Sequence, residues 1–173
     1  MTECIITMRD GGQMRFALYP DKAPITVASF AEAANGGFFD GLAFCRIVKG
    51  FVIQGGSPDN DIMTDSDFHI FGEFAENGVD TGLTHARGAI SMARDEAPNT
   101  AGTQFFICHQ DAHRLDGKYA AFGMMTQGWG VLDALAETPT FGKETWNKPV
   151  DMPVIASIRV VADAPLPPVK RLP

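Results

Sequence analysis

The sequence predicts a mainly β domain, a closed eight-stranded antiparallel β-barrel capped by two α-helices. Eight short runs are rich in β-branched and aromatic residues and are bounded by Gly, Pro, Asn or Asp. Only two windows have the spacing of an amphipathic helix. A sheet of many short strands is expected to close on itself when few helices are present, because open edges invite aggregation.

The predicted strands begin near the start of the chain. The runs 3–9 and 13–19 alternate in hydrophobicity around Asp10-Gly11-Gly12. Asp-Gly and Gly-Gly readily adopt the positive φ of a tight turn, so these two runs are expected to form a hairpin. The other six runs are 44–48, 51–54, 88–93, 103–108, 120–126 and 153–161.

Two windows predict the helices. The first, 23–37, has Pro24 near its start and a Gly-Gly pair at its end, while the second, 128–138, is shorter and is followed by Pro139. Each presents apolar residues at helical spacing: Val27, Phe30, Ala31 and Ala34 in the first, and Val131, Leu132 and Leu135 in the second. The helices are expected to cover the ends of the barrel.

Two segments show no regular pattern. Residues 57–87 contain many turn formers, so we expect a long ordered loop, and loops of this length usually have a function. Residues 164–173 are proline-rich and are expected to be extended and frayed. A chain of 173 residues suits one domain, so we place that domain at 1–163 and a tail at 164–173.

Composition excludes several classes of partner. Fourteen basic and 21 acidic residues give a formal charge of −7, which argues against nucleic-acid binding. Neither a signal peptide nor an apolar run of membrane-spanning length is evident, so no membrane partner is expected. The three cysteines have no C-x-x-C spacing and lie in apolar runs, which favours buried thiols in a cytoplasmic protein. No heptad pattern is present, and a monomer is expected.

Four motifs stand in a characteristic order: "FDGLAF" (39–44), "FCRIVKGFVIQGG" (44–56), "GAISMARDEAPNTAGTQFFI" (88–107) and "LDGKYAAFG" (115–123). They resemble the signature of the cyclophilin family of peptidyl-prolyl cis-trans isomerases, in the tyrosine-containing form common among bacterial members. The resemblance runs from about Cys4 to about Val161. It implies the cyclophilin-like barrel and an enzyme that accelerates rotation about X-Pro bonds in proline-containing peptides and in unfolded or refolding proteins. No cofactor is implied.

Arg46 matches the family's catalytic arginine. The unaided rotation faces a barrier of about 18–20 kcal/mol and takes tens to hundreds of seconds. A guanidinium that donates to the prolyl nitrogen as this atom becomes pyramidal would stabilise the twisted state more than the planar one. Without the surrounding motif, an arginine on this strand would be read as an ordinary solvent-facing residue.

The resemblance also implies a substrate-binding groove. Its residues fall into three groups: those that enclose the proline ring, those that hold Arg46 and the peptide, and those whose backbone lies along the substrate. They are Phe51, Val52, Phe106, Leu115 and Tyr119 in the first group, Gln54 and Gln104 in the second, and Ala93 and Arg94 in the third. Phe105 and Phe106 must point to opposite faces of a strand, and the motif assigns Phe106 to the groove.

Three positions depart from the pattern of many family members. Arg114 stands where tryptophan is common and where that tryptophan contributes to cyclosporin binding, so weak cyclosporin binding is expected. Val52 replaces methionine, and Tyr119 replaces histidine. The implied chemistry needs no proton transfer, so loss of the imidazole is not expected to abolish activity. Arg114 and its neighbour His113 are candidates for setting a charge preference at the rim.

Two other functions are compatible with parts of the sequence. A proline-peptide binding module could keep the same groove with little catalysis, but it would not need an arginine directed at the prolyl nitrogen. His109 and His113 have the H-x-x-x-H spacing of a helical metal site, which would suit a metal-dependent hydrolase. No third ligand and no H-E-x-x-H glutamate accompany them, so no metal site is expected.

Overall fold

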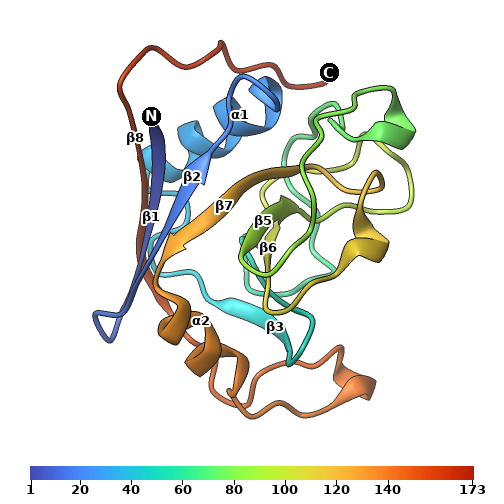
Figure 1. Cartoon of the computed structure of the whole chain (residues 1–173). Coiled ribbons are helices and arrows are strands. Elements are labelled where there is room, and N and C mark those ends of the chain that lie inside the picture. Colours follow the sequence, from blue (N-terminus) through green and yellow to red (C-terminus); the bar gives the residue numbers. More distant parts are fainter.

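The computed structural model describes all residues from 1 to 173 and is built on one eight-stranded antiparallel sheet with two α-helices (Figure 1). The strands are β1 (Thr2–Met8), β2 (Gln13–Leu18), β3 (Phe44–Val48), β4 (Val52–Gly55), β5 (Ala89–Met92), β6 (Phe105–Cys108), β7 (Ala121–Gln127) and β8 (Ile155–Ala162). The helices are α1 (Pro24–Asn35) and α2 (Trp129–Ala136), with 3₁₀ turns η1 (Ala75–Asn77), η2 (His113–Leu115) and η3 (Lys143–Thr145).

The predicted strands and helices are confirmed. All neighbouring strands pair antiparallel, in the order β3-β4-β6-β5-β7-β2-β1-β8. The opening hairpin pairs β1 with β2, and Gly11 in its turn has φ +94°, a conformation that L side chains rarely adopt. Both helices lie within their predicted windows.

The barrel is less fully closed than the sequence predicted. The edge strands β3 and β8 share no ladder, and only the single bridge between Ala43 and Val154 joins their ends. Further along β3, the Ile47 amide donates to Asn147 in the preceding loop instead of to β8. Pro153 accepts from the Phe44 amide but has no N–H to return the bond, so pairing stops there. The sheet is therefore a curled half-barrel with a short seam.

A core of 30 buried residues fills the concave side of the sheet, under α1. Phe30 of α1 lies at its centre, with ring centroids 5.3 Å from Phe39, 5.5 Å from Phe105 and 5.0 Å from Phe122. Full burial of one such ring contributes about 1.5–3 kcal/mol. The helix therefore fixes the inner face of the sheet and leaves the outer face of β4, β5 and β6 available for a site.

The two irregular segments behave differently. Residues 57–87 form the expected long loop, with only η1 in it. The tail is extended as predicted, but it is pinned to the surface and not frayed (Figure 1). Arg171 pairs with Glu32 at 2.8 Å and its guanidinium carbon lies 3.8 Å from the ring centre of Phe68, while the Leu172 amide donates to His69. Neither helix has the length and apolar character needed to cross a bilayer.

Candidate active site

A second, smaller apolar cluster lies on the outer face of the sheet. It is built from β4, β5 and β6 and the loop that follows, and contains Val52, Ala89, Phe106, Cys108 and Ala112. Phe105 points into the main core and Phe106 points outward into this cluster, because successive side chains of a strand alternate between faces. The outer cluster forms the floor of a cavity.

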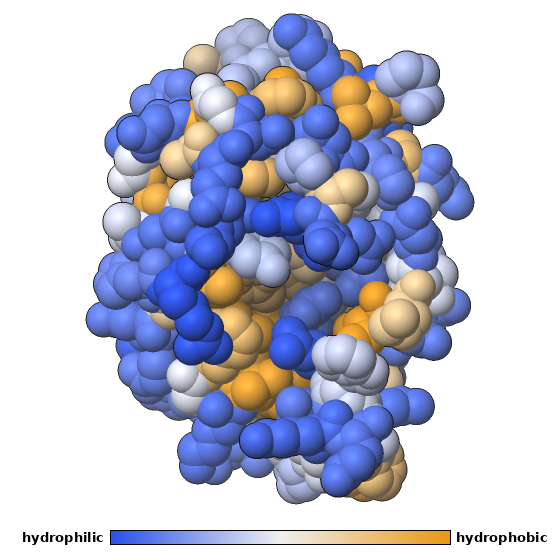
Figure 2. Space-filling model, turned by 90° about the vertical axis from the view of Figure 1, so that its right-hand side faces the viewer, coloured by the Kyte–Doolittle hydropathy of each residue, from blue (hydrophilic) through white to orange (hydrophobic).

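The cavity has a volume of about 210 Å³ and an apolar lining of six out of nine residues. Figure 2 shows on this side of the molecule a hollow with a hydrophobic floor and a mostly hydrophilic rim. We call it the proline pocket, after the ring that the sequence motifs predict it to enclose, and its lining consists of Arg46, Phe51, Val52, Gln54, Ala93, Arg94, Phe106, Leu115 and Tyr119. All nine were candidate site residues from the sequence, and the fold brings them together from β3, β4, β6 and three connecting segments.

A β-bulge aims Arg46 at this pocket. Phe44 of β3 stands opposite Gly55 of β4, yet Arg46 stands opposite Gln54, so Cys45 is an extra residue on β3. Bulges change the direction of the next side chains and increase the local twist. Phe44 and Cys45 are both buried, while Arg46 is half-buried and reaches the pocket.

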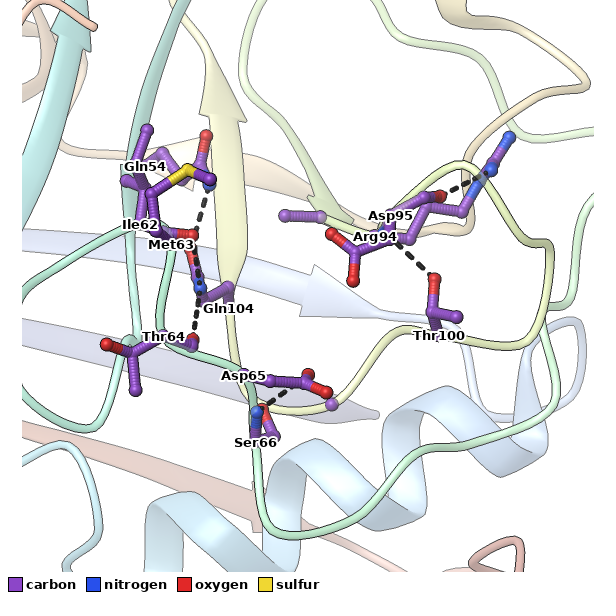
Figure 3. Close-up of a pocket in the computed structure, with 12 residues that line it drawn as sticks. Gln54, Ile62, Met63, Thr64, Asp65, Ser66, Arg94, Asp95, Thr100 and Gln104 are labelled. Atoms are coloured by element: carbon purple, nitrogen blue, oxygen red, sulfur yellow. Dashed lines mark hydrogen bonds between the residues drawn. The ribbon is translucent and has the colours of Figure 1, made fainter.

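A chain of hydrogen bonds positions Arg46. Its Nη1 donates to Gln54 Oε1 at 3.1 Å, and Gln54 Nε2 donates to Gln104 Oε1 at 3.0 Å. Gln104 Nε2 then donates to the carbonyl oxygens of Ile62 and Thr64, each at 3.1 Å (Figure 3). Arginine can only donate and backbone carbonyls can only accept, so both amide orientations are determined by the ends of the chain.

The environment of Arg46 is partly desolvated. Burial lowers the pKa of the Arg46 guanidinium from its usual value, although arginine remains charged in proteins. Its Nε is shielded from solvent and has no hydrogen-bond partner. An unsatisfied buried donor is rare in folded proteins and is typical of functional sites. Arg46 therefore keeps donor capacity in a region of low polarity, where hydrogen bonds are stronger than in water.

Arg94 contributes more than the backbone contact that was expected from the sequence. Its Nε and Nη2 donate to Lys118 O at 2.9 and 2.6 Å, and its Nη1 donates to the carbonyls of Asp95 and Glu96. The guanidinium carbon lies 4.7 Å from the Phe74 ring centre and 4.8 Å from that of Tyr119. Arg94 thus ties three loops together and supports the Tyr119 wall. No local pattern in the sequence predicts such contacts.

His85 was not predicted from the sequence as a residue of the site. It is fully buried behind the pocket floor, and its ring stacks on Phe106 with centroids 5.9 Å apart and an interplanar angle of 19°. Nδ1 lies 2.9 Å from Asp116 Oδ1, and Nε2 lies 2.8 Å from Ser91 Oγ. The only available signal was a histidine just before a predicted strand, and nothing in that pattern distinguishes a buried ring from an exposed one.

The protonation of His85 follows from its surroundings. Burial lowers the pKa of His85 below its usual value of 6.5, and the hydrogen bond to Asp116 only partly opposes this effect. Desolvation acts to raise the pKa of Asp116, but hydrogen bonds from His85 and His113 outweigh it and lower that pKa. A neutral imidazole that donates from Nδ1 to the carboxylate and accepts at Nε2 from Ser91 satisfies all three groups.

Arg114 lies at the rim, next to the proline pocket and outside its lining. It is exposed on η2, and its guanidinium carbon lies 4.2 Å from the ring centre of Phe51. No carboxylate is within salt-bridge distance of it, whereas the neighbouring His113 faces Asp116 at 2.9 Å. The pocket wall at Phe51 is thus covered by the positive charge of Arg114, whereas the tryptophan that is common at this position would be neutral.

The two histidines of the H-x-x-x-H pattern lie in separate networks. His109 accepts from the Gly50 amide at Nδ1 and approaches Asp133 with Nε2 at 3.0 Å. His113 instead faces Asp116 across η2. No group of three or more His, Cys, Asp or Glu side chains has an arrangement that could hold a metal ion.

A polar pocket adjoins the proline pocket. It has a volume of about 80 Å³ and lies between the segments 62–66 and 93–104 (Figure 3). Both cavities share Gln54, Ala93 and Arg94 in their walls, so the two form one groove. Its polar side chains include Asp65 and Asp95, and Asp65 is bound to His69. The remaining predicted residue, Gln104, lines this second part.

Comparison with known proteins gives a consistent result. The family described as "Cyclophilin type peptidyl-prolyl cis-trans isomerase/CLD" matches residues 4–160. Peptidyl-prolyl cis-trans isomerase B of Bacillus subtilis is 42% identical over 121 residues, which cover 70% of this chain and 81% of that protein. Peptidyl-prolyl cis-trans isomerase-like 1 of Neurospora crassa is 39% identical over 153 residues, covering 88% and 90% of the two chains.

A solved structure has the same fold. The crystal structure of a Cryptosporidium parvum cyclophilin type peptidyl-prolyl cis-trans isomerase, obtained in the presence of the dipeptide Ala-Pro, superposes with a TM-score of 0.82 at 28% identity. The superposition covers 93% of this chain and 99% of that one. The similarity therefore extends over nearly the whole fold, including the strands that carry the groove.

Proposed function

The chain belongs to the family of cyclophilin-type peptidyl-prolyl cis-trans isomerases, and from this membership we propose how its groove performs the reaction. The protein is an isomerase that accelerates rotation about X-Pro peptide bonds and binds proline-containing peptides. The residue roles below are our proposal, and the single observation that carries it is the half-buried Arg46 at the wall of an apolar pocket.

Arg46 is the catalytic residue in this proposal. Rotation about the X-Pro bond removes amide resonance and leaves a lone pair on the prolyl nitrogen, and this loss is the origin of the barrier of about 18–20 kcal/mol. A donor aimed at that nitrogen interacts more strongly with the twisted bond than with the planar one. The partial desolvation of Arg46 supports this role, because a hydrogen bond that its guanidinium forms only in the transition state is stronger in a region of low polarity.

The pocket contributes by positioning the substrate and Arg46, and not by supplying reactive groups. The rings of Phe51, Phe106 and Tyr119 offer an apolar enclosure for the proline side chain. Gln54 and Gln104 hold the guanidinium in place, so the Arg46 side chain loses less conformational entropy when the substrate binds. No group in this scheme has to gain or lose a proton, and Tyr119 serves through its ring.

The proposed partners are polypeptides whose X-Pro bonds can enter this open groove. Unfolded and refolding proteins present accessible X-Pro bonds, and we propose them as the clients. With Arg114 at the rim we propose weak cyclosporin binding, and the protein is proposed to act as a monomer. Cys4, Cys45 and Cys108 are free and buried, which supports work in a reducing compartment such as the cytoplasm.

The test is two-dimensional exchange NMR of an Ala-Pro peptide with wild type, Arg46→Ala and Arg46→Lys. Arg46→Ala should reduce the catalysed exchange about 100- to 1,000-fold, as expected when one transition-state donor is removed. Arg46→Lys should recover little of it, because an ammonium lacks the planar fork. Arg9→Ala is the control, since Arg9 is exposed and lies on the distant β1–β2 hairpin.

Each result has a clear meaning. Circular dichroism should show that all variants are folded. Accelerated exchange that collapses only in the Arg46 variants supports the assigned role. Peptide shifts without accelerated exchange would mean that the groove binds proline peptides and does not catalyse, and full activity in Arg46→Ala would remove Arg46 from the mechanism.

A further inference from the structure

Only some of the arginines of this acidic protein have their charge neutralised by a nearby carboxylate. Four of the eight pair with carboxylates, and four do not. The paired ones are Arg15 with Glu3, Arg87 with Asp133, Arg159 with Asp40 and Arg171 with Glu32. Of the four others, only Arg9 is remote, while Arg46, Arg94 and Arg114 all border the proline pocket. In a chain of formal charge −7, three of the four arginines without a carboxylate partner therefore lie at the groove.

The proline pocket itself has no acidic residue in its lining. Arg46 is bonded to a neutral amide, and Arg94 is bonded to main-chain carbonyls. These bonds satisfy N–H donors but leave the formal charges uncompensated. Both guanidinium groups therefore add to a positive potential over the pocket, and a low-dielectric wall such as this one strengthens that potential.

Arg114 is the cation that is free to meet a ligand. Its guanidinium carbon lies over the Phe51 ring at 4.2 Å from the ring centre and the side chain makes no hydrogen bond, so its planar donors remain open for a bidentate contact with a carboxylate. The acidic side chains nearest in sequence are already engaged. Asp116 accepts from His85 and His113, and Asp111 accepts from the Arg87 amide.

We propose that Arg114 selects clients that carry an Asp or Glu side chain close to the proline, with Arg46 and Arg94 reinforcing the same preference. This inference rests on the proposed function of the groove and specifies its substrate class. The preference applies to one side of the proline, because the two carboxylates of Asp65 and Asp95 outnumber the single cation of Arg94 in the lining of the polar pocket and oppose an acidic residue there. The groove thus has a positive end and a negative end.

Single-proline peptides with Glu, Gln or Lys at the same position test the proposal. Two series place this residue either before or after the proline, and exchange NMR gives kcat/KM while peptide shifts give Kd. Wild type should favour Glu over Gln by about threefold in one series, in the range of an exposed ion pair. Glu over Lys should reach about tenfold at low ionic strength, and 0.5 M salt should largely remove both ratios.

Variants assign the effect to one side chain. Arg114→Gln should remove most of the Glu/Gln preference and leave only the small part due to Arg46 and Arg94, and Arg114→Glu should invert the Glu/Lys ratio. Arg9→Gln is the matched control, because it removes the same formal charge from an exposed arginine without a carboxylate partner and should keep the wild-type ratio. A Glu/Gln ratio that stays at its wild-type value in Arg114→Gln, or that falls equally in Arg9→Gln, would overturn the proposal.

The experiment distinguishes a failure of the catalytic proposal from a failure of the proposed charge preference. A wild type that does not accelerate exchange of the Gln peptide contradicts the catalytic proposal, and the Kd ratios still report the charge preference. Acceleration of all peptides at equal kcat/KM, with equal Kd, leaves catalysis intact and overturns only the selectivity. A Glu preference of equal size on both sides of the proline would also overturn it, since one rim residue cannot produce both.

Discussion

The two faces of β6 use neighbouring phenylalanines in different ways. Phe105 is fully buried and lies in a purely apolar setting, 5.4 Å from Phe39 and 6.0 Å from Phe44 between ring centroids. Phe106 is 5% exposed and is backed by the polar, hydrogen-bonded ring of His85. The inner face therefore supplies stability through packing, whereas the outer face depends on a buried polar network to hold an apolar wall open to ligands.

The largest effect is expected when the inner face is broken. Phe105→Ala leaves a cavity amid Phe30, Phe39 and Phe44 and should lower the free energy of unfolding by about 3–5 kcal/mol. Urea denaturation followed by circular dichroism measures this loss. The fraction that stays folded at low temperature should keep most of its isomerase activity, because the groove lies on the other face.

Phe106→Ala is the matched variant one residue along. The stability loss should be smaller, about 1.5–3 kcal/mol, because water can fill the pocket. The isomerase kcat/KM should fall by about tenfold, corresponding to about 1.4 kcal/mol of lost contact with the proline ring. Equal stability losses with unchanged activity in both variants would contradict the division of labour between the faces.

The hydrogen-bond chain offers the next effect. Gln104→Glu replaces the Nε2 donor with an oxygen that faces the carbonyls of Ile62 and Thr64. The repulsion should cost about 1–3 kcal/mol of stability and displace the 62–64 segment. The kcat/KM should fall by about tenfold, because small displacements of a positioned group cost up to about 100-fold.

The control for this variant is Gln127→Glu, which adds the same charge at an exposed glutamine on β7 without a side-chain hydrogen bond. It should leave both unfolding and activity close to wild type. Peptide exchange by NMR and urea unfolding measure the two quantities. If both variants behave alike, the chain through Gln104 does not position Arg46.

The smallest effect concerns pH. Since burial lowers the pKa of His85 in the folded state, the unfolded chain binds the extra proton first as the pH falls. The stability from this group is therefore complete above about pH 6.5 and is lost as the pH drops through the folded-state pKa. Urea unfolding between pH 7.5 and pH 5 should show this decline.

Two histidine variants separate this contribution from the others. His85→Gln can still bond to Asp116 and Ser91, and it should flatten the decline between about pH 6.5 and 5. His69→Gln serves as control, because His69 is half-buried beside Asp65 and is not part of the outer cluster. The same pH slope in wild type and His85→Gln would show that His85 is not the group that titrates.

The sequence predicted the elements better than the contacts between them. Strands and helices follow from local alternation and helical spacing, and the nine residues of the proline pocket came from long motifs. The seam of the half-barrel depends on which loop reaches the Ile47 amide, about 100 positions away at Asn147. His85 bonds to Asp116 31 residues away and Arg94 bonds to Lys118 24 residues away, and no local pattern encodes such pairs.

Arg114 at the rim also has a consequence for optical spectroscopy, because the groove contains no indole. Trp129, 37% exposed, lies on α2 beneath Arg87, and Trp146, 60% exposed, follows η3. Neither lines the proline pocket. Tryptophan emission will therefore report on α2 and the η3 segment, and a peptide in the pocket will leave it largely unchanged. Arg114→Trp would introduce one indole beside Phe51, whose emission would respond directly to an occupied groove.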